Sequence, residues 1–338
     1  MKTWKSGHMN RIYASIEDLV GSTPLFEPVR VEKQLHLTSH LLCKLEGLNP
    51  AGSIKDRAAL SMLQAAEADG TLSPGDTIVE QTSGNTGIAL ASMAIPRGYH
   101  CEIFLESGVT PERRTILRAL GCRLLDYRDV PGAGDPDAPF DPFREATLEE
   151  IRRYCTAMGP SFHFLDQTSN PANPQAHIRS TGPEIWKDTD GCVDALVLMA
   201  GTGGTLCGLS TYLRKKNPKI HIAAVEPAPC SVRSEENPSC KIIDGVLRFD
   251  DRPDAACSSF LHHDLYDECM EVSAESAHRT ALLIARQEGL LFGTSGAAAL
   301  TAAMELSKRP LFAGKNIVVI IPDGGGKYLS SFLYSDQA

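Results

Sequence analysis

Hydrophobic residues recur along this chain in two alternating patterns. Short runs of β-branched and other apolar residues alternate with longer stretches whose apolar positions fall on one helical face. The short runs predict strands at residues 77–80, 101–105, 122–126, 193–200, 221–225 and 316–321. The longer stretches predict helices at residues 54–68, 111–120, 146–158, 174–186, 205–216, 274–288, 296–307 and 327–334. Gly, Pro and Asn cluster between them, as in loops. The alternation is typical of an α/β fold with a mainly parallel sheet.

Composition narrows the function classes. The chain has 338 residues, 42% hydrophobic and 22% charged, which is ordinary for a globular enzyme of two lobes or one large domain. The net charge is −9 and the basic residues are dispersed, so we expect no nucleic-acid partner. Apolar runs fall short of the ~18 residues of a membrane span, and residues 1–19 lack the apolar core of a signal peptide, so we expect no membrane association. Residues 1–8 resemble an expression remnant and carry no fold argument.

Ten cysteines raise the question of disulfides or metal. None forms a CxxC pair, and the adjacent His262 and His263 lack ligand spacing to a cysteine. Small buried apolar residues in a reducing compartment explain cysteines of this kind in a large chain. We therefore expect no metal site and a cytoplasmic protein.

One segment is unlike the rest. Residues 128–143 hold four prolines and four aspartates, which predicts irregular structure. The segment either lines a substrate entrance or is a surface insertion, and the sequence leaves both open.

Lys55 lies in the stretch Asn-Pro-Ala-Gly-Ser-Ile-Lys-Asp-Arg of residues 49–57. Ser53 followed by Asp56 resembles a helix-capping signature, which predicts Lys55 on the first turn of a helix. A lysine that forms a Schiff base must be neutral part of the time, and partial desolvation favours this. Taken alone, the stretch is equally compatible with an ordinary solvated lysine.

A glycine-rich turn follows the predicted strand at 193–200. It comprises Gly201, Thr202, Gly203, Gly204 and Thr205, and it opens a predicted helix. Free N–H groups and the positive end of a helix favour a phosphate, and the two threonines add hydroxyl donors. The turn is neither a Walker loop nor a GxGxxG motif. A tight strand–helix turn without a ligand is the alternative.

Residues 82–87, Thr-Ser-Gly-Asn-Thr-Gly, form a second small-residue turn between strand and helix. Together with the Lys55 stretch and the 201–205 turn, this turn makes the chain resemble the fold-type II pyridoxal-phosphate (PLP) enzymes. The closest branch is cysteine synthase / cystathionine β-synthase, over about residues 16–333. The resemblance implies two lobes, each with a mainly parallel twisted sheet. Residues 9–46 with 164–338 would form the larger lobe, which holds the cofactor phosphate, and residues 47–163 the smaller, mobile one.

The resemblance also assigns roles. Lys55 would carry the cofactor, residues 201–205 its phosphate, Asn85 its ring hydroxyl and Ser295 its pyridine nitrogen, with Thr294 as the fallback. A hydroxyl does not hold that nitrogen protonated, which suits β-elimination better than transamination. The 322–329 stretch would close the cofactor pocket behind Ser295. The substrate carboxylate would be bound by Thr82, Ser83, Gly84, Thr86 and Gln167.

The chain departs from the family near the substrate side chain. Most relatives carry a Gly-Ile-Gly turn there. This chain keeps Gly245 but has Leu247 in place of the second glycine, and Asp244 and Arg248 flank the turn. Arg248 would bind a phosphate leaving group, or Asp244 would act as a base that activates water. The third interpretation is that both are solvated loop charges.

The resemblance implies β-replacement on an O-activated L-serine, either O-acetylserine or O-phosphoserine. Sulfide or another thiol would then form L-cysteine through an aminoacrylate intermediate. Alternatives are L-cysteine breakdown to hydrogen sulfide with serine or pyruvate, transfer of the amino-carboxyethyl group to another amine or thiol, and a PLP-binding regulatory paralogue without turnover. A homodimer is expected from the family.

Overall fold

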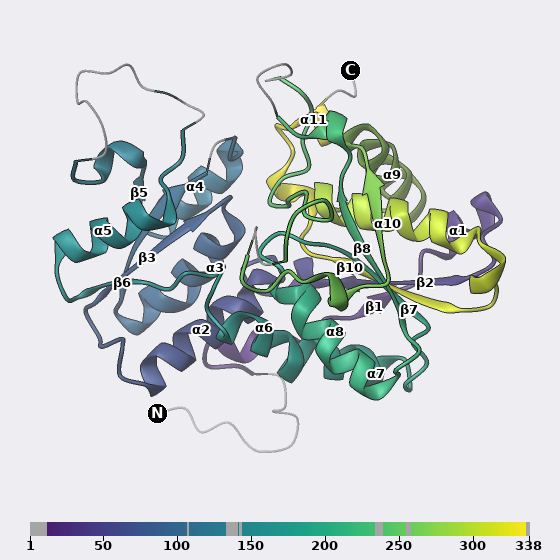
Figure 1. Cartoon of the computed structure of the whole chain (residues 1–338), viewed down its shortest axis with the longest axis horizontal. Coiled ribbons are helices and arrows are strands. Elements are labelled where there is room, and N and C mark those ends of the chain that lie inside the picture. Colours follow the sequence, from purple (N-terminus) through teal and green to yellow (C-terminus); the bar gives the residue numbers. More distant parts are fainter. Residues whose placement is uncertain are drawn as a thin grey trace.

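The computed structural model describes residues 12–106, 108–132, 141, 144–233, 239–254 and 258–335. Two sheets organise these residues, and Figure 1 shows them as two neighbouring parts of the molecule. All strand pairs are parallel except β1 with β2. The α/β class with mainly parallel sheets is therefore confirmed.

The smaller sheet has the strand order β5-β4-β3-β6. Its strands are β3 (Thr77–Thr82), β4 (His100–Leu105), β5 (Arg123–Leu125) and β6 (Phe162–Phe164). Successive strand side chains point to opposite faces, and both faces of this sheet are apolar. Helices α2 (Lys55–Ala68), α3 (Asn85–Ala94) and α4 (Pro111–Ala119) pack around Ile78 and Ile103 on one face. Helix α5 (Leu148–Met158) packs on Val79 and Phe104 on the other.

The larger sheet has the order β1-β2-β10-β7-β8-β9. Its strands are β1 (Leu25–Phe26), β2 (His40–Leu45), β7 (Ala195–Met199), β8 (His221–Pro227), β9 (Glu268–Val272) and β10 (Asn316–Ile321).

Helices cover both faces of this larger sheet as well. Leu196 and Leu198 of β7 pack with α7 (Gly182–Asp188) and α8 (Gly204–Lys216). The alternate Val197 and Met199 pack with α9 (Ala274–Glu288) and α10 (Thr294–Ser307). A strand buried on both faces reads as an unbroken apolar run, as β7 does.

Most predicted elements are found within two residues of their expected ends, and 274–288 and 316–321 match at both ends. Six elements had no predicted range, namely α1 (Val29–Leu35), α3, β1, β2, β6 and β9; for α3 only its presence after the 82–87 turn was expected. Residues 1–8 and most of the 128–143 segment lie outside the described residues. None of the helices in the described part combines the length and apolar character that crossing a bilayer requires.

Two helix predictions need correction. The helix expected at 174–186 is α6 (Ala172–Ala176), a wider π turn at His177–Thr181, and then α7. Pro183 has no N–H to donate to the preceding turn, which favours such a local rearrangement.

The helix expected at 327–334 is also wrong. It is replaced by a 3-10 turn at Gly325–Lys327 and the single-turn α11 (Phe332–Ser335). Between them the Ser331 hydroxyl bonds to Tyr328 O at 2.7 Å and accepts from Leu333 N at 3.3 Å. Side-chain bonds of this kind compete with helical hydrogen bonding.

Candidate active site

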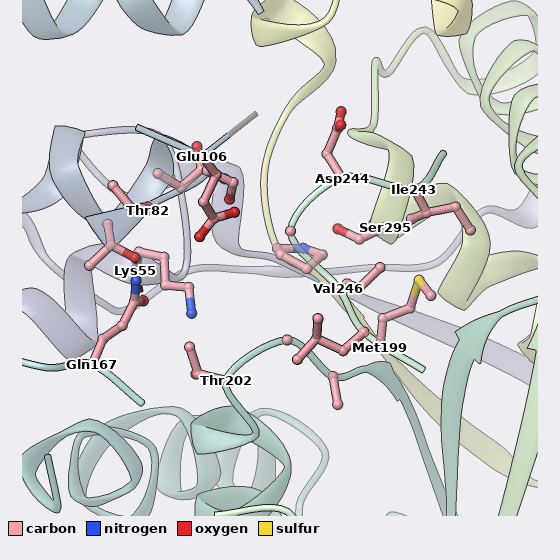
Figure 2. A pocket seen from close by; sticks show the side chains of 18 of the residues that line it. Lys55, Thr82, Glu106, Gln167, Met199, Thr202, Ile243, Asp244, Val246 and Ser295 are labelled. Carbon is pink, nitrogen blue, oxygen red and sulfur yellow. Dashed lines mark hydrogen bonds between the residues drawn. The ribbon is translucent and has the colours of Figure 1, made fainter. Parts of the chain in front are cut away.

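A cavity of about 540 Å3 lies where strands of both sheets end. The residues after β3, β4, β7 and β10 all line it, so it sits at the carboxyl ends of parallel strands, where ligand sites of α/β folds usually form. Figure 2 shows Lys55, Thr82 and Gln167 on one side of this cavity and Ser295 on the other. The cavity therefore brings together three of the sequence motifs.

Lys55 is the first residue of α2, as predicted. The predicted Ser53–Asp56 capping signature differs in detail from the structure. The helix-capping position is Ile54, and Ser53 Oγ accepts from Lys55 N at 3.2 Å. Asp56 accepts from Ala51 N at 2.6 Å, which fixes the preceding turn. Burial lowers the pKa of Lys55 to about 8, although Glu106 and Glu80 act in the opposite direction. The lysine is thus partly neutral near physiological pH.

The glycine-rich turn opens α8 and faces the cavity. Gly203 has a φ of +80°, a left-handed conformation that favours glycine. A Cβ on Gly204 would lie 2.2 Å from Asn173 Oδ1, and one on Gly201 would lie 2.3 Å from Gly245 O. Only glycine fits at those two positions, and the turn leaves the first N–H groups of α8 directed at the cavity end of the helix.

Side chains of a neighbouring helical segment contact the hydroxyls of the two threonines in this turn. Asn173 Nδ2 donates to Thr202 Oγ1 at 3.2 Å, and the buried His177 has Nε2 3.2 Å from Thr205 Oγ1. Burial lowers the pKa of His177 to about 3, so its imidazole is neutral and adds no charge. Asn173 and His177 were not predicted as site residues. Their signal in the sequence is weak, because each lies in an ordinary helical stretch.

The turn after β3 forms the opposite wall. Thr82 Oγ1 accepts from Gly84 N at 3.0 Å, and Gly84 has a φ of +126°. Thr86 donates to Gln167 Oε1 at 2.6 Å, and Gln167 Nε2 donates to Gln81 O at 2.8 Å. Thr82, Ser83, Thr86 and Gln167 all line the cavity, so four of the five predicted carboxylate-binding residues meet there, and Gly84 shapes the turn between them.

Ser295 lies on the first turn of α10 and lines the cavity. The fallback residue Thr294 is fully buried, and its hydroxyl accepts from Asp244 N at 3.3 Å. The geometry thus favours Ser295 over Thr294 as the hydroxyl that a bound molecule would meet.

Asp244, Gly245 and Arg248 also line the cavity. Burial raises the pKa of Asp244, with Arg113 acting against the shift. Arg248 pairs with Glu226 at 3.0 Å and with Glu271 at 2.7 Å. A phosphate would compete with these two carboxylates for the Arg248 guanidinium.

Of the charged cavity residues that were not predicted, Glu80, Glu106 and Arg113 are the most strongly shielded from water. Burial raises the pKa of Glu80 to about 8 and that of Glu106 to about 7. Arg113 is almost fully buried and lies over the Tyr328 ring, with its guanidinium carbon 4.5 Å from the ring centroid. The sequence feature that could have indicated them is Glu80, a charged residue inside the apolar run of β3.

Comparison with known proteins decides the family. A family model described as pyridoxal-phosphate dependent enzyme matches residues 16–323. Cysteine synthase A of Escherichia coli (strain K12) is 35% identical over 330 residues, covering 97% of both chains. The chain belongs to the PLP-dependent enzymes, in the fold-type II cysteine synthase family.

Solved structures agree with this family. The structure of an O-ureido-L-serine synthase has a TM-score of 0.81 at 31% identity, covering 97% of this chain and 96% of that one. A hydrogen sulfide-producing enzyme from Fusobacterium nucleatum has a TM-score of 0.80 at 31% identity, covering 94% of this chain and 100% of that one. The resemblance carried by the three motifs is confirmed.

The cavity of this PLP enzyme fits its cofactor. It holds a primary amine of lowered pKa, a helix terminus whose glycines let an anion approach, and a hydroxyl rather than a carboxylate on α10. Among the described residues, three potential metal ligands gather at Glu27, Glu32 and His40. They already serve the fold: Glu27 pairs with His40 at 2.7 Å, and Glu32 accepts from Leu41 N at 2.6 Å.

Proposed function

We propose that this PLP enzyme replaces the β-substituent of an O-activated L-serine with sulfide or another thiol, giving L-cysteine. One observation carries the proposal. A lysine with a pKa of about 8 faces a single cavity together with an anion-binding helix terminus, a hydroxyl-rich turn and the Ser295 hydroxyl. The similarity to cysteine synthase A supports the same reaction class.

Each side chain has a proposed task. Bound PLP supplies an electron sink for the charge that develops at the substrate Cα. The 201–205 turn binds its phosphate, Asn85 meets its ring hydroxyl, and Ser295 hydrogen-bonds its pyridine nitrogen without holding a proton there. Lys55 Nζ carries the cofactor and then takes the proton from the substrate Cα, for which a pKa of about 8 is suitable.

The substrate carboxylate is proposed to bind the turn after β3. The hydroxyls of Thr82, Ser83 and Thr86 and the amide of Gln167 offer several convergent donors, as a carboxylate requires. A Cβ on Gly245 would lie 3.1 Å from Ser83 Oγ, so this turn already meets the 244–248 segment across the cavity. A substrate held there would be shielded from water.

Arg248 bears on the identity of the leaving group. Because Arg248 is engaged by Glu226 and Glu271, its position favours O-acetylserine over O-phosphoserine. Both esters remain the donors to be compared.

A second candidate is L-cysteine breakdown with release of sulfide. Asp244 supports it, because this carboxyl lines the cavity and burial raises its pKa, as suits a base that activates water. The structural likeness to a hydrogen sulfide-producing enzyme points the same way. We also propose, from the family, a homodimer in the cytoplasm and a smaller lobe formed by residues 47–163.

Rapid-mixing absorbance measurements would test these proposals. The holoenzyme is mixed separately with O-acetylserine, O-phosphoserine and cysteine, each without added nucleophile. A long-lived new absorption band with one ester, discharged by sulfide, identifies a synthase and its donor. No response to either ester, with sulfide released from cysteine and abolished by Asp244→Asn, would overturn the synthase proposal. Bound cofactor without any response would indicate a regulatory paralogue.

A further inference from the structure

The side chain of Asn85 is held between two charged groups that the proposed reaction does not use. Its Nδ2 donates to Asp323 Oδ2 at 2.7 Å, and its Oδ1 accepts from Lys327 Nζ at 3.0 Å. Asn85 begins α3 beside the smaller sheet, whereas both charged residues follow β10 of the larger one. The contact therefore connects elements of the two sheets at the cavity.

Lys327 has little freedom to do anything else. Its side chain is mostly buried, and Nζ donates to Ala51 O at 3.1 Å and Gly52 O at 3.2 Å as well as to Asn85. An ammonium has three hydrogens, so these three acceptors use all of them. Two of the three belong to the segment that leads into Lys55. The ammonium thus fixes the Lys55 segment and the Asn85 amide at the same time.

Asp323 is equally constrained. It is 1% exposed, and Oδ2 accepts from Tyr328 OH at 2.8 Å in addition to Asn85. A Cβ on Gly293 would lie 1.9 Å from Asp323 Oδ1, so the glycine makes room for this carboxyl. Arg113 Nη2 lies 3.8 Å from Oδ2 and adds a nearby positive charge.

These contacts determine which way the Asn85 amide faces. Its oxygen lies against a cation and one N–H against a carboxylate. A flipped amide would place its NH2 group against the Lys327 ammonium and its oxygen against the Asp323 carboxylate, and both contacts would be repulsive. Hydrogen bonds to charged groups are stronger than those between neutral groups, so the observed orientation is strongly preferred. Asn85 lines the cavity, and its second N–H is what it can offer to a group bound there.

We propose that Lys327 and Asp323 are positioning residues that orient Asn85 so that an N–H meets the ring hydroxyl of PLP. The inference rests on the proposed function, in which Asn85 meets that hydroxyl. A donor there favours the ionised form of the ring oxygen. Loss of the orientation would favour the neutral form, whose absorption lies at shorter wavelength.

A double-mutant cycle tests this through the cofactor spectrum. Lys327→Met keeps the length of the side chain but removes the ammonium. We expect it to shift the ratio of the visible to the near-ultraviolet band of the bound cofactor several-fold toward the near-ultraviolet, and to weaken PLP binding about 10-fold. In an Asn85→Ala background, the same substitution should leave the band ratio unchanged.

Thr110→Val is the matched control. The Thr110 hydroxyl donates to the backbone oxygen of Lys327 at 2.9 Å, so its loss disturbs the same turn without touching the ammonium. No change in band ratio is expected. An equal shift with and without Asn85, or no shift in Lys327→Met, would overturn the positioning role. If Lys327→Met does not fold, Asp323→Asn provides the same cycle with a smaller shift in the same direction.

The spectrum of the wild-type protein distinguishes failure of the proposed function from failure of the positioning role. A wild-type protein that binds no PLP would overturn the proposed function, and this inference with it. A wild type with a normal cofactor band and unaffected variants would overturn only the role of Lys327 and Asp323.

Discussion

Two cations on the first turn of α2 have opposite surroundings. Lys55 and Arg57 are two residues apart, which places them about 200° apart around the helix. Arg57 is 2% exposed and pairs with Glu46 at 2.7 Å and with Glu184 at 2.7 Å. Lys55 faces the cavity. One short turn thus supplies a structural charge on one side and a reactive one on the other.

Pairing explains the difference. Hydrogen bonds and charge from Arg57 lower the pKa of Glu184 to about 2 against the effect of burial, and the Arg57 pKa rises despite burial. Around Lys55, burial dominates, lowering its pKa to about 8 and raising that of Glu80 to about 8. A buried group paired closely with an opposite charge stays ionised, whereas one for which desolvation dominates becomes able to exchange protons near neutral pH.

The largest expected effect is on turnover. Lys55→Ala removes the amine that carries the cofactor and moves the Cα proton, so we expect a loss of at least ~10^3-fold in product formation. The fold should be kept, because the side chain faces a cavity and not the core. Steady-state assays with the preferred serine ester, together with thermal melts, measure both. Activity within 10-fold of the wild type would contradict the assignment of Lys55.

Arg57→Met should instead lower the free energy of unfolding. It leaves the fully buried Glu46 without its cation, which costs about 3–5 kcal/mol in unfolding free energy. Denaturant unfolding measures the loss. Arg128→Met is the control, since the Arg128–Asp126 pair is exposed and its loss should leave the unfolding free energy almost unchanged. Equal effects of the two substitutions would show that burial of the Arg57 cluster adds nothing.

The third prediction concerns the rate at which the apoprotein takes up PLP. Only the neutral amine reacts with the cofactor aldehyde, and a pKa of about 8 in place of 10.5 raises its neutral fraction at neutral pH roughly 300-fold. The uptake rate, followed by absorbance, should rise with pH and level off above about pH 8. A rate that still climbs steeply toward pH 10 would show that Lys55 is not desolvated in this way.

The same contrast explains what the sequence could predict about the fold. Strand β10 and helix α9 were predicted at both ends, because an apolar run and an apolar helical face are local signals. Strand β2 was missed, since Lys44 interrupts its apolar pattern. That lysine is fully buried and pairs at 2.9 Å with Glu184, far away in the sequence. Partners of this kind cannot be read from local pattern.

The site shows the same limit. Lys55, the 82–87 turn and the 201–205 turn lie in contiguous motifs, and the structure brings them to one cavity. Glu106 and Lys327 were given no role in the site, because each looks like an ordinary charge at the end of a predicted element, Glu106 after the strand at 101–105 and Lys327 at the start of the helix at 327–334. Their significance comes from burial and from contacts between distant elements, as in the bond from Lys327 to Asn85.

The smallest expected effect is the pH dependence of stability, where the two clusters should have opposite signs. The folded-state pKa of Glu184 is lowered to about 2 from 4.5, so its contribution is present above pH 4.5 and is lost as pH falls toward 2. Because the Glu184 side chain is partly exposed, solvent screening makes this loss smaller than the full shift would give. The pKa of Glu80 is raised to about 8, so its contribution is full below pH 4.5 and is lost as pH rises to about 8.

Unfolding free energies measured across pH would separate the two carboxyls. Glu184→Gln should flatten the acid side of the stability profile, because the group that gains a proton there is gone. Glu80→Gln should flatten the side that falls toward pH 8, because an amide stays neutral as the protonated acid does. If both substitutions flattened the same side, the distinction between a paired structural cluster and a desolvated reactive one would fail.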